Sequence, residues 1–302
     1  MNDLIPGAVA GPADGKNFEA SWFGGYLQAQ MLTDVGLKRQ KNEDSCLICA
    51  PKDTALSDAR GLFFSVADGM GGASAGEYAS RMSLRAMHHA YYTGPEAAIP
   101  EALRDALEEA NQHVFEEAEV NPDYAGMGTT VSAVLVFGCW AYIAQVGDSR
   151  VYLLRDGAGI HQITDDHSLV AEQVRNGVIS EEEAENSSFK NLITRAVGIK
   201  PDVEVDLFAV RLRLGDTLLI CSDGLSNMVP NREIASCLSD SDLKQGTRNV
   251  VELALENGGT DNVTAVTIRV TGNPPHSPLQ PGAREITVAG GSFLQRLLAW
   301  FR

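Results

Sequence analysis

Short apolar runs recur along the chain and predict β-strands. They are rich in β-branched and aromatic residues, and most are bounded by glycine or aspartate, which is typical of buried strands. Residues 129–157 predict three strands joined by short turns at Phe137-Gly138 and Gly147-Asp148, which indicates an antiparallel meander. The remaining predicted strands lie at residues 26–36, 44–50, 62–68, 216–222 and 262–270.

Apolar residues at helical spacing predict helices in the segments outside these strands. In residues 74–92 they are Ala79, Met82, Ala86 and Met87, which predicts one amphipathic helix. A second helix is expected over 97–120, and two more are expected near 231–240 and 241–258. Because strands and helices come in separate runs without a regular βαβ alternation, the fold class is predicted as α+β with antiparallel sheets.

The two ends of the chain differ in composition from the middle. Residues 1–20 are rich in Gly, Pro, Ala and Asp, which predicts a flexible N-terminal leader before a domain at 21–271. Residues 272–302 predict a proline-rich linker followed by a short amphipathic helix in GGSFLQRLLAWFR. Two interpretations of that helix stay open: it docks on its own domain, or it binds a partner or a membrane surface.

Charge and cysteine content narrow the class of protein. The formal net charge of −16 argues against a nucleic-acid partner, because phosphate contacts need clustered Lys and Arg. The number of cysteines, five, is odd and they are widely spaced, so no disulfide framework is expected. There is no signal-peptide pattern and no apolar stretch long enough to span a bilayer. We therefore expect a cytoplasmic protein without a transmembrane segment.

Candidate chemistry lies where predicted strands meet glycine. Asp68, Asp148, Asp223 and Asp261 each stand at a strand end beside or near glycine. If those strands are neighbours, the carboxylates converge and repel one another, and a divalent cation would relieve the repulsion. Oxygen ligands without His or Cys indicate Mg²⁺ or Mn²⁺, and two bridged ions would form a hydrolytic centre. One Asp-Gly alone would indicate only a turn; the repetition favours a metal site.

The glycine-rich loop DGMGGASAGEYAS is not a phosphate cradle. In the P-loop pattern Glu77 would occupy the lysine position, and an anion there repels phosphate. The dinucleotide fingerprint fails because Ser74 stands where the third glycine is needed. In VGLKRQKNEDS, Arg39 could hold a phosphate bidentately beside a metal centre, or form only a surface salt bridge with Glu43 or Asp44.

These pieces together resemble a known family, the type 2C metal-dependent Ser/Thr protein phosphatases in their bacterial form. The matching motifs are TDVGLKRQKNEDS, FFSVADGMGG, GMGTTVSAVLV, AYIAQVGDSRVYLLRDG, ITDDHS, ITRAVG, LLICSDGL and GGTDNVTAV. They run in the family's order from Gln30 to Val270, about four-fifths of the chain.

The resemblance implies an α/β/β/α sandwich of two antiparallel sheets flanked by helices, and a centre of two Mn²⁺ or Mg²⁺ ions. It implies that Asp68 bridges both ions and that Gly69 offers its carbonyl. Asp223 and Asp261 would complete the first ion's ligands, and Asp148 with Asp223 would hold a third, weaker ion. Glu43 and Asp44 would act near the second ion, partly through water, and Arg39 would bind the substrate phosphate.

The activity implied is hydrolysis of phosphoserine and phosphothreonine on proteins by a metal-bridging hydroxide, opposing a Ser/Thr kinase, by a monomer. Cys221 is then a packing residue, and His167 in DDHS is interpreted as a structural hydrogen-bonding residue. Ala73 stands where bacterial relatives carry a histidine. Two alternatives remain: a non-catalytic binding module with this fold, and a hydrolase of small phosphoesters.

Overall fold

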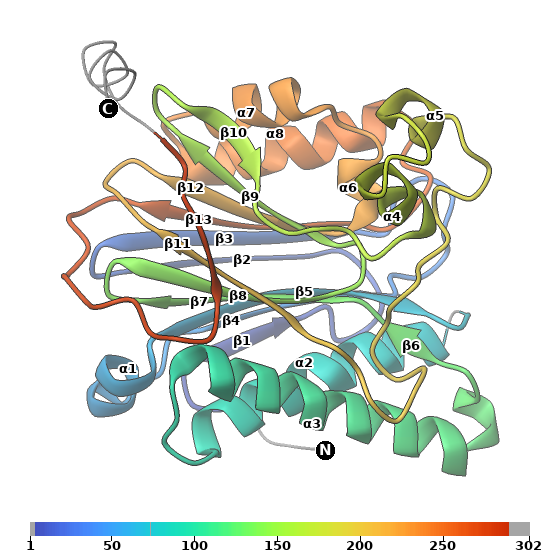
Figure 1. Cartoon of the computed structure of the whole chain (residues 1–302), viewed down its shortest axis with the longest axis horizontal. Coiled ribbons are helices and arrows are strands. Elements are labelled where there is room, and N and C mark those ends of the chain that lie inside the picture. The colour runs from blue at the N-terminus through green and yellow to red at the C-terminus, as the bar shows by residue number, and fades with distance from the viewer. Residues whose placement is uncertain (1–3, 73, 290–302) are drawn as a thin grey trace.

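Two sheets stacked face to face form the centre of the molecule, which we describe from a computed structural model covering residues 4–72 and 74–289. Figure 1 shows the four layers, with helices outside each sheet. The first sheet has the order β1-β4-β5-β7-β8-β11-β14, and β6 pairs with the C-terminal end of β5. Its strands are β1 (Ala8–Gly11), β4 (Asp44–Cys49), β5 (Leu62–Met70), β6 (Gly128–Thr129), β7 (Val131–Phe137), β8 (Trp140–Val146), β11 (Asp206–Arg211) and β14 (Arg284–Ile286).

The second sheet has the order β10-β9-β12-β13-β3-β2. Every strand pair in the two sheets is antiparallel except β11 with β14, which is parallel. The strands are β2 (Phe18–Gly24), β3 (Leu27–Asp34), β9 (Arg150–Arg155), β10 (Gly159–Gln162), β12 (Thr217–Cys221) and β13 (Val263–Val270).

Helices cover both outer faces. Those against the first sheet are α2 (Ala75–Thr93) and α3 (Ile99–Val120); those against the second are α7 (Asn231–Leu238) and α8 (Leu243–Glu256) (Figure 1). The shorter helices are α1 (Thr54–Arg60), the 3₁₀ turn Pro122–Tyr124, α4 (Leu169–Arg175), α5 (Glu181–Glu185) and α6 (Asp223–Ser226). The predicted α/β/β/α sandwich is confirmed. No helix of the described part is long and apolar enough to cross a membrane.

Strand β5 shows why its sequence is a continuous apolar run. Phe63 and Ala67 face α2 and α3, whereas Phe64 and Val66 face the other sheet. All four are fully buried. A strand buried on both faces cannot alternate polar and apolar residues, so the run is dictated by the layers around it. This central position also fixes the strand's C-terminal end, where Asp68 lies.

Both ends of the chain differ from expectation. Residues 8–20 were expected to be flexible, yet β1 pairs with β4 and β2 pairs with β3. Residues 272–289, expected as a linker, lie along the first sheet: the Ser277 carbonyl accepts a hydrogen bond from Trp140 Nε1 at 3.1 Å, and β14 pairs with β11. These segments therefore pack on the domain. The predicted C-terminal helix at 290–302 falls outside the described residues.

Candidate metal centre

The strand-end aspartates come from both sheets and gather at one end of the sandwich. Asp68 lies near the C-terminal end of β5, and Asp44 lies opposite it at the start of β4. In the second sheet, Asp223 lies just after β12, and Asp261 lies just before β13, the strand that pairs with β12. Desolvation raises the pKa of Asp68 well above its usual range, and repulsion from Asp44, Asp223, Asp148 and Asp261 adds to the shift. The structure thus brings these five carboxyl groups together.

Desolvation is the largest cause of the raised pKa values in this cluster. It raises the pKa of Asp44 to about 7, although hydrogen bonds from Thr264 and Ser222 oppose the shift. It also raises the pKa of Asp148 to about 7, with Asp223 and Asp166 adding repulsion. Ionising all of these carboxyl groups together is unfavourable, because their negative charges repel one another. A bound cation would offset that repulsion, so the cluster is suited to a metal ion.

Asp44 is the most enclosed of these groups. Its Oδ2 accepts hydrogen bonds from Thr264 Oγ1 at 2.6 Å and Ser222 Oγ at 2.7 Å. Its Oδ1 is buried and has no hydrogen-bond partner. Buried polar atoms are normally satisfied, so this orphaned oxygen indicates a missing partner such as a cation or a water bound to one. Ser222 and Thr264 were not predicted from the sequence, because polar residues at strand ends carry no distinctive pattern.

Close backbone packing explains the glycine after Asp68. A Cβ on Gly69 would lie 2.1 Å from the Gly76 carbonyl oxygen and 2.7 Å from that of Glu43. A Cβ on Gly76 would in turn lie 2.2 Å from the Glu43 carboxylate. Only glycine lets β5, the first turn of α2 and the Glu43 backbone meet here. Gly69 and Gly76 therefore allow close backbone packing beside the carboxylates.

Arg39 lies at the mouth of the cluster, but its partner differs from the one considered from the sequence. Its Nη2 donates to Asp261 Oδ2 at 2.8 Å, and the two side chains are 48% and 35% exposed. Glu43 is buried, and desolvation raises the pKa of its carboxyl group. The Glu43 backbone N–H donates to Asn262 Oδ1 at 2.8 Å. Asn262, also missed from the sequence, thus ties the Arg39 loop to β13.

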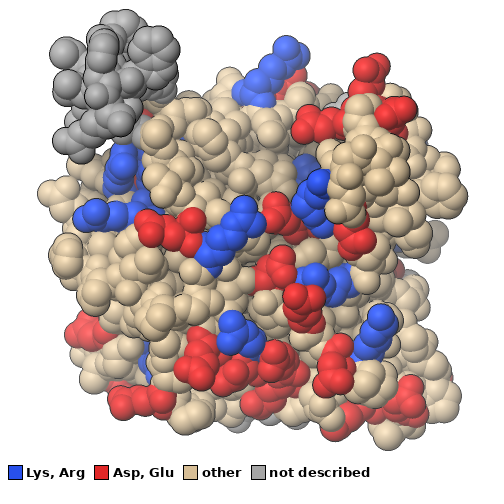
Figure 2. All heavy atoms as spheres, viewed as in Figure 1, with Lys and Arg blue, Asp and Glu red and all other residues tan. Residues whose placement is uncertain are grey.

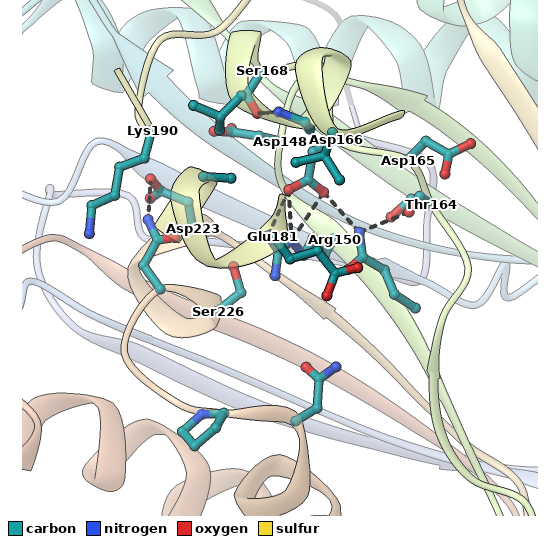
Figure 3. A pocket seen from close by; sticks show the side chains of 18 of the residues that line it. Asp148, Arg150, Thr164, Asp165, Asp166, Ser168, Glu181, Lys190, Asp223 and Ser226 are labelled. Carbon is teal, nitrogen blue, oxygen red and sulfur yellow. Dashed lines mark hydrogen bonds and ion pairs between the residues drawn. The ribbon is translucent and has the colours of Figure 1, made fainter. Parts of the chain in front are cut away.

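A cavity of about 870 Å³ opens beside Asp148 and Asp223. One wall is residues 168–195, here called the flap, which carries α4 and α5; the opposite wall is residues 226–231 (Figure 3). On its floor Arg150 makes three hydrogen bonds of 2.7–3.0 Å to the Asp166 carboxylate. Its apolar lining consists of Val170, Ala171, Val174, Ala184, Met228, Val229 and Pro230.

The acidic run EEEAE of the flap contributes little to this cavity. Glu183 forms a capping box with Ser180 at the start of α5, and Glu181 lines the cavity whereas Glu182 and Glu183 do not. Figure 2 shows acidic side chains gathered along the lower part of the face it draws, over α3, and a mixture of acidic and basic side chains above them. The run is therefore largely a solvated helix face.

The carboxylates share one region without a formed coordination sphere. Among residues 4–72 and 74–289, no group of three or more His, Cys, Asp or Glu side chains is placed closely enough to hold a metal ion as the side chains stand. Desolvation raises the pKa of the Cys221 thiol to about 12, which fits its predicted packing role rather than a nucleophile. Ala73 lies outside the described residues.

Comparison with known proteins adds independent findings. The family model for Protein phosphatase 2C matches residues 38–258. A serine/threonine phosphatase stp of Listeria welshimeri is 39% identical over 247 residues, covering 80% of this chain and 95% of that protein. The crystal structure of the Mycobacterium tuberculosis serine/threonine phosphatase PstP/Ppp superposes with a TM-score of 0.72 at 37% identity, covering 82% and 99% of the chains. A structure of the PstP catalytic domain in complex with two manganese ions gives a TM-score of 0.70 at 37% identity, covering 82% and 99%.

Proposed function

The chain belongs to the protein phosphatase 2C family and is a protein serine/threonine phosphatase, and we propose which of its residues carry out the hydrolysis. The observation that carries the proposal is the cluster of strand-end carboxyl groups whose pKa values are raised by desolvation and mutual repulsion. Such a cluster of converging oxygen ligands is a good site for hard divalent cations, whose charge offsets the repulsion.

The residues present fit two Mn²⁺ or Mg²⁺ ions. Every side-chain donor is a carboxylate oxygen, Asp44 Oδ1 is an orphaned buried acceptor, and the Gly69 position admits no side chain. We assign Asp68, the Gly69 carbonyl, Asp223 and Asp261 to hold the pair, with Glu43 and Asp44 acting through water. A third, weaker ion belongs at Asp148 with Asp223. When bound, the ions supply Lewis acidity that activates water and neutralises phosphate charge.

The protein's own residues then bind and orient the phosphate. Arg39 stands at the exposed mouth of the cluster and uses one N–H on Asp261. A guanidinium has five N–H donors, so the others can hold two phosphoryl oxygens while Asp261 keeps the group in place. Arg39 therefore orients the phosphate and stabilises the charge that develops on its oxygens.

The cavity beside Asp148 and Asp223 suits the peptide that flanks the phosphoresidue. Apolar side chains line both the flap wall and the opposite wall, and the floor charges of Arg150 and Asp166 neutralise each other. A peptide segment can bury apolar atoms there, whereas a small phosphoester would not reach these walls. This favours a phosphoprotein substrate over the small-phosphoester alternative.

The cellular setting follows from the substrate class and the cysteines. All five cysteines are free thiols, which supports a reducing compartment. We propose that the enzyme acts in the cytoplasm as a monomer and reverses the work of a Ser/Thr kinase. The non-catalytic alternative depends on Ala73; every carboxyl group assigned to the metals is present.

Calorimetric titration with Mn²⁺ tests the metal assignment. The wild-type chain should bind at least two ions, and Asp68→Asn should lose the tight binding. Asp165→Asn is the matched control, since Asp165 lines the same cavity but pairs with Arg284 on the surface at 3.1 Å. Equal Mn²⁺ binding by wild type and Asp68→Asn would contradict the assignment.

A further inference from the structure

His167 is a buried histidine, 2% exposed, whose ring is engaged at both nitrogens. Its Nδ1 accepts a hydrogen bond from the backbone N–H of Gly147 at 3.0 Å. A backbone N–H can only donate, so Nδ1 carries no proton and the ring proton is on Nε2. Nε2–H then donates to Asp206 Oδ2 at 3.1 Å, and Arg195 Nη1 lies 3.1 Å from the same ring nitrogen. With both nitrogens engaged in this way, His167 is not a proton donor to a leaving group.

The backbone of His167 makes two further links. Its N–H donates to the Gly147 carbonyl at 3.0 Å, so both the ring and the backbone of His167 are hydrogen-bonded to Gly147. Its own carbonyl accepts from the N–H of Thr194 at 2.8 Å, where the flap returns to the domain. Gly147 has a φ of +105° and directly precedes Asp148. His167 therefore fixes, through two hydrogen bonds, the turn that carries Asp148.

The far side of the ring leads to the end of the flap. Asp206 is the first residue of β11, and its Oδ1 accepts from Arg195 Nη1 at 2.7 Å. Arg195 is the last residue of the flap as defined above. One buried side chain thus connects the Asp148 turn, the first sheet through β11, and the returning end of the flap.

The base of the flap is also held by the Leu169 N–H bond to the Leu192 carbonyl and by Thr194 Oγ1 bonding Glu172, whereas most described side chains of residues 175–192 are exposed. Val178, Phe189 and Leu192 are 67%, 60% and 51% exposed. The cavity separates the flap from residues 226–231 (Figure 3). A segment with few buried contacts opens at low free energy, so its base controls its position.

We propose that His167 is a positioning residue that couples the flap to Asp148, through Gly147 on one side and Asp206 with Arg195 on the other. The proposal rests on the assigned role of Asp148 as a ligand of the third ion. Because coupling between two sites is reciprocal, a cation that fixes Asp148 also steadies the flap, and a flap closed on substrate strengthens cation binding at Asp148.

Hydrogen–deuterium exchange on the metal-free full chain tests the link itself. His167→Ala should speed exchange both at Gly147 and at Thr194, by roughly three- to tenfold for each hydrogen bond lost. His167→Asn should keep Gly147 protected, because its Oδ1 can accept in place of Nδ1, and should loosen only the Thr194 end. His161→Ala is the control, an exposed histidine on β10 that contacts the Ala158 carbonyl in its own hairpin.

The pattern of exchange decides the outcome. A residue that merely fills space would give the same loosening in both His167 variants, and equal exchange in the two would overturn the proposal, as would exchange like that of the wild type. His167→Asn keeps the test decisive where His167→Ala does not fold. Adding Mn²⁺ gives a second readout: it should slow flap exchange in the wild type and lose that effect in His167→Ala. Equal slowing in both would also overturn the coupling.

The two claims fail differently. If Asp148 binds no cation, Mn²⁺ leaves flap exchange in the wild type unchanged and the coupling to a cation is overturned, while calorimetry on Asp68→Asn still reports on the two-ion centre. If the centre itself is misassigned, Asp68→Asn binds Mn²⁺ like the wild type, and the metal-free exchange pattern still reports on His167.

Discussion

Asp44 and Asp68 face each other directly across the neighbouring strands β4 and β5. Like charges at paired positions of a sheet are destabilising, and here desolvation adds to the cost. The fold does not avoid this arrangement; it adds Asp148, Asp223 and Asp261 around it. A site that is unfavourable without a counter-charge and favourable with one is what a metal-dependent enzyme requires, and the following predictions depend on it.

Neutralising Asp148 should stabilise the metal-free protein in a pH-dependent way. Its folded-state pKa of about 7 lies above the ordinary value of 3.8, so its ionised form opposes folding. The destabilisation is small below pH 4, grows between pH 4 and 7, and is complete above pH 7. At about 1.4 kcal/mol for each pKa unit, Asp148→Asn should gain a few kcal/mol at pH 8 and little at pH 4. Denaturant unfolding with a chelator present measures this.

The matched control is Asp165→Asn, which removes a surface carboxylate from the same cavity. It should change the unfolding free energy by less than about 1 kcal/mol at either pH. An Asp148→Asn gain that is equal at pH 4 and pH 8 would show that the charge cluster is not its cause.

His88 predicts acid sensitivity elsewhere in the fold. It is fully buried on α2, neither ring nitrogen has a hydrogen-bond partner, and desolvation lowers its pKa to about 4. The unfolded chain therefore binds a proton between pH 6.5 and 4 that the folded chain does not, and stability falls as the pH drops through that window. His88→Phe should remove this loss while keeping ring contacts with Phe63 and Tyr92, so its advantage should be larger at pH 5 than at pH 8, by about 2 kcal/mol. Thermal unfolding at the two pH values checks it, with His161→Phe as the exposed control.

The cavity predicts a difference between peptide and small substrates. Val174→Lys places a charge on the apolar flap wall and should raise the KM for a phosphothreonine peptide by roughly tenfold, while the KM for an aryl phosphate stays the same. Val178→Lys is the control, because Val178 is exposed on the same flap and does not line the cavity. If both substrates lose equally in Val174→Lys, the cavity does not bind the flanking peptide.

Residues 272–289 should matter for stability, because a buried ion pair holds them. Arg155 bonds Asp216 at 2.7 and 2.9 Å and donates to the Val288 carbonyl at 2.7 Å, with both charged side chains at most 5% exposed. Arg155→Met leaves Asp216 buried without its partner and should cost about 3–5 kcal/mol of unfolding free energy. Arg284→Met, which breaks a surface pair, should cost less than about 1 kcal/mol. Equal losses would mean that the buried Arg155 side chain, with its bonds to Asp216 and Val288, contributes no more than the surface pair.

What could be predicted from the sequence was local. The run before Asp68 is a strand buried on both faces, and the spacing of Ala79, Met82 and Ala86 is that of α2, so each element carries its own signal. The ends of the chain carry none: β1 and β2 are strands only because β4 and β3 offer them partners. Gly and Pro in those segments indicate flexibility when the partner is not known.

The candidate site divides in the same way. Asp68 and Asp223 stand out as carboxylates placed between a strand and glycine, and the structure brings them together. The contact of Arg39 with Asp261 spans 222 residues, and nothing local in either segment indicates it. Asn262, Ser222 and Thr264 were missed because a polar residue at a strand end is ordinary until its buried partner is known.

Metal-dependent turnover tests the central claim most directly. Phosphate release from a phosphothreonine peptide should be titrated with Mn²⁺ for wild type, Asp223→Asn and the control Asp165→Asn. The wild type and the control should gain activity with Mn²⁺ and lose it with a chelator, and Asp223→Asn should fall on the order of 100-fold or more. A folded wild type without turnover at millimolar Mn²⁺, or an Asp223→Asn enzyme as active as the control, would contradict the assignment of these carboxylates to the metals that drive hydrolysis.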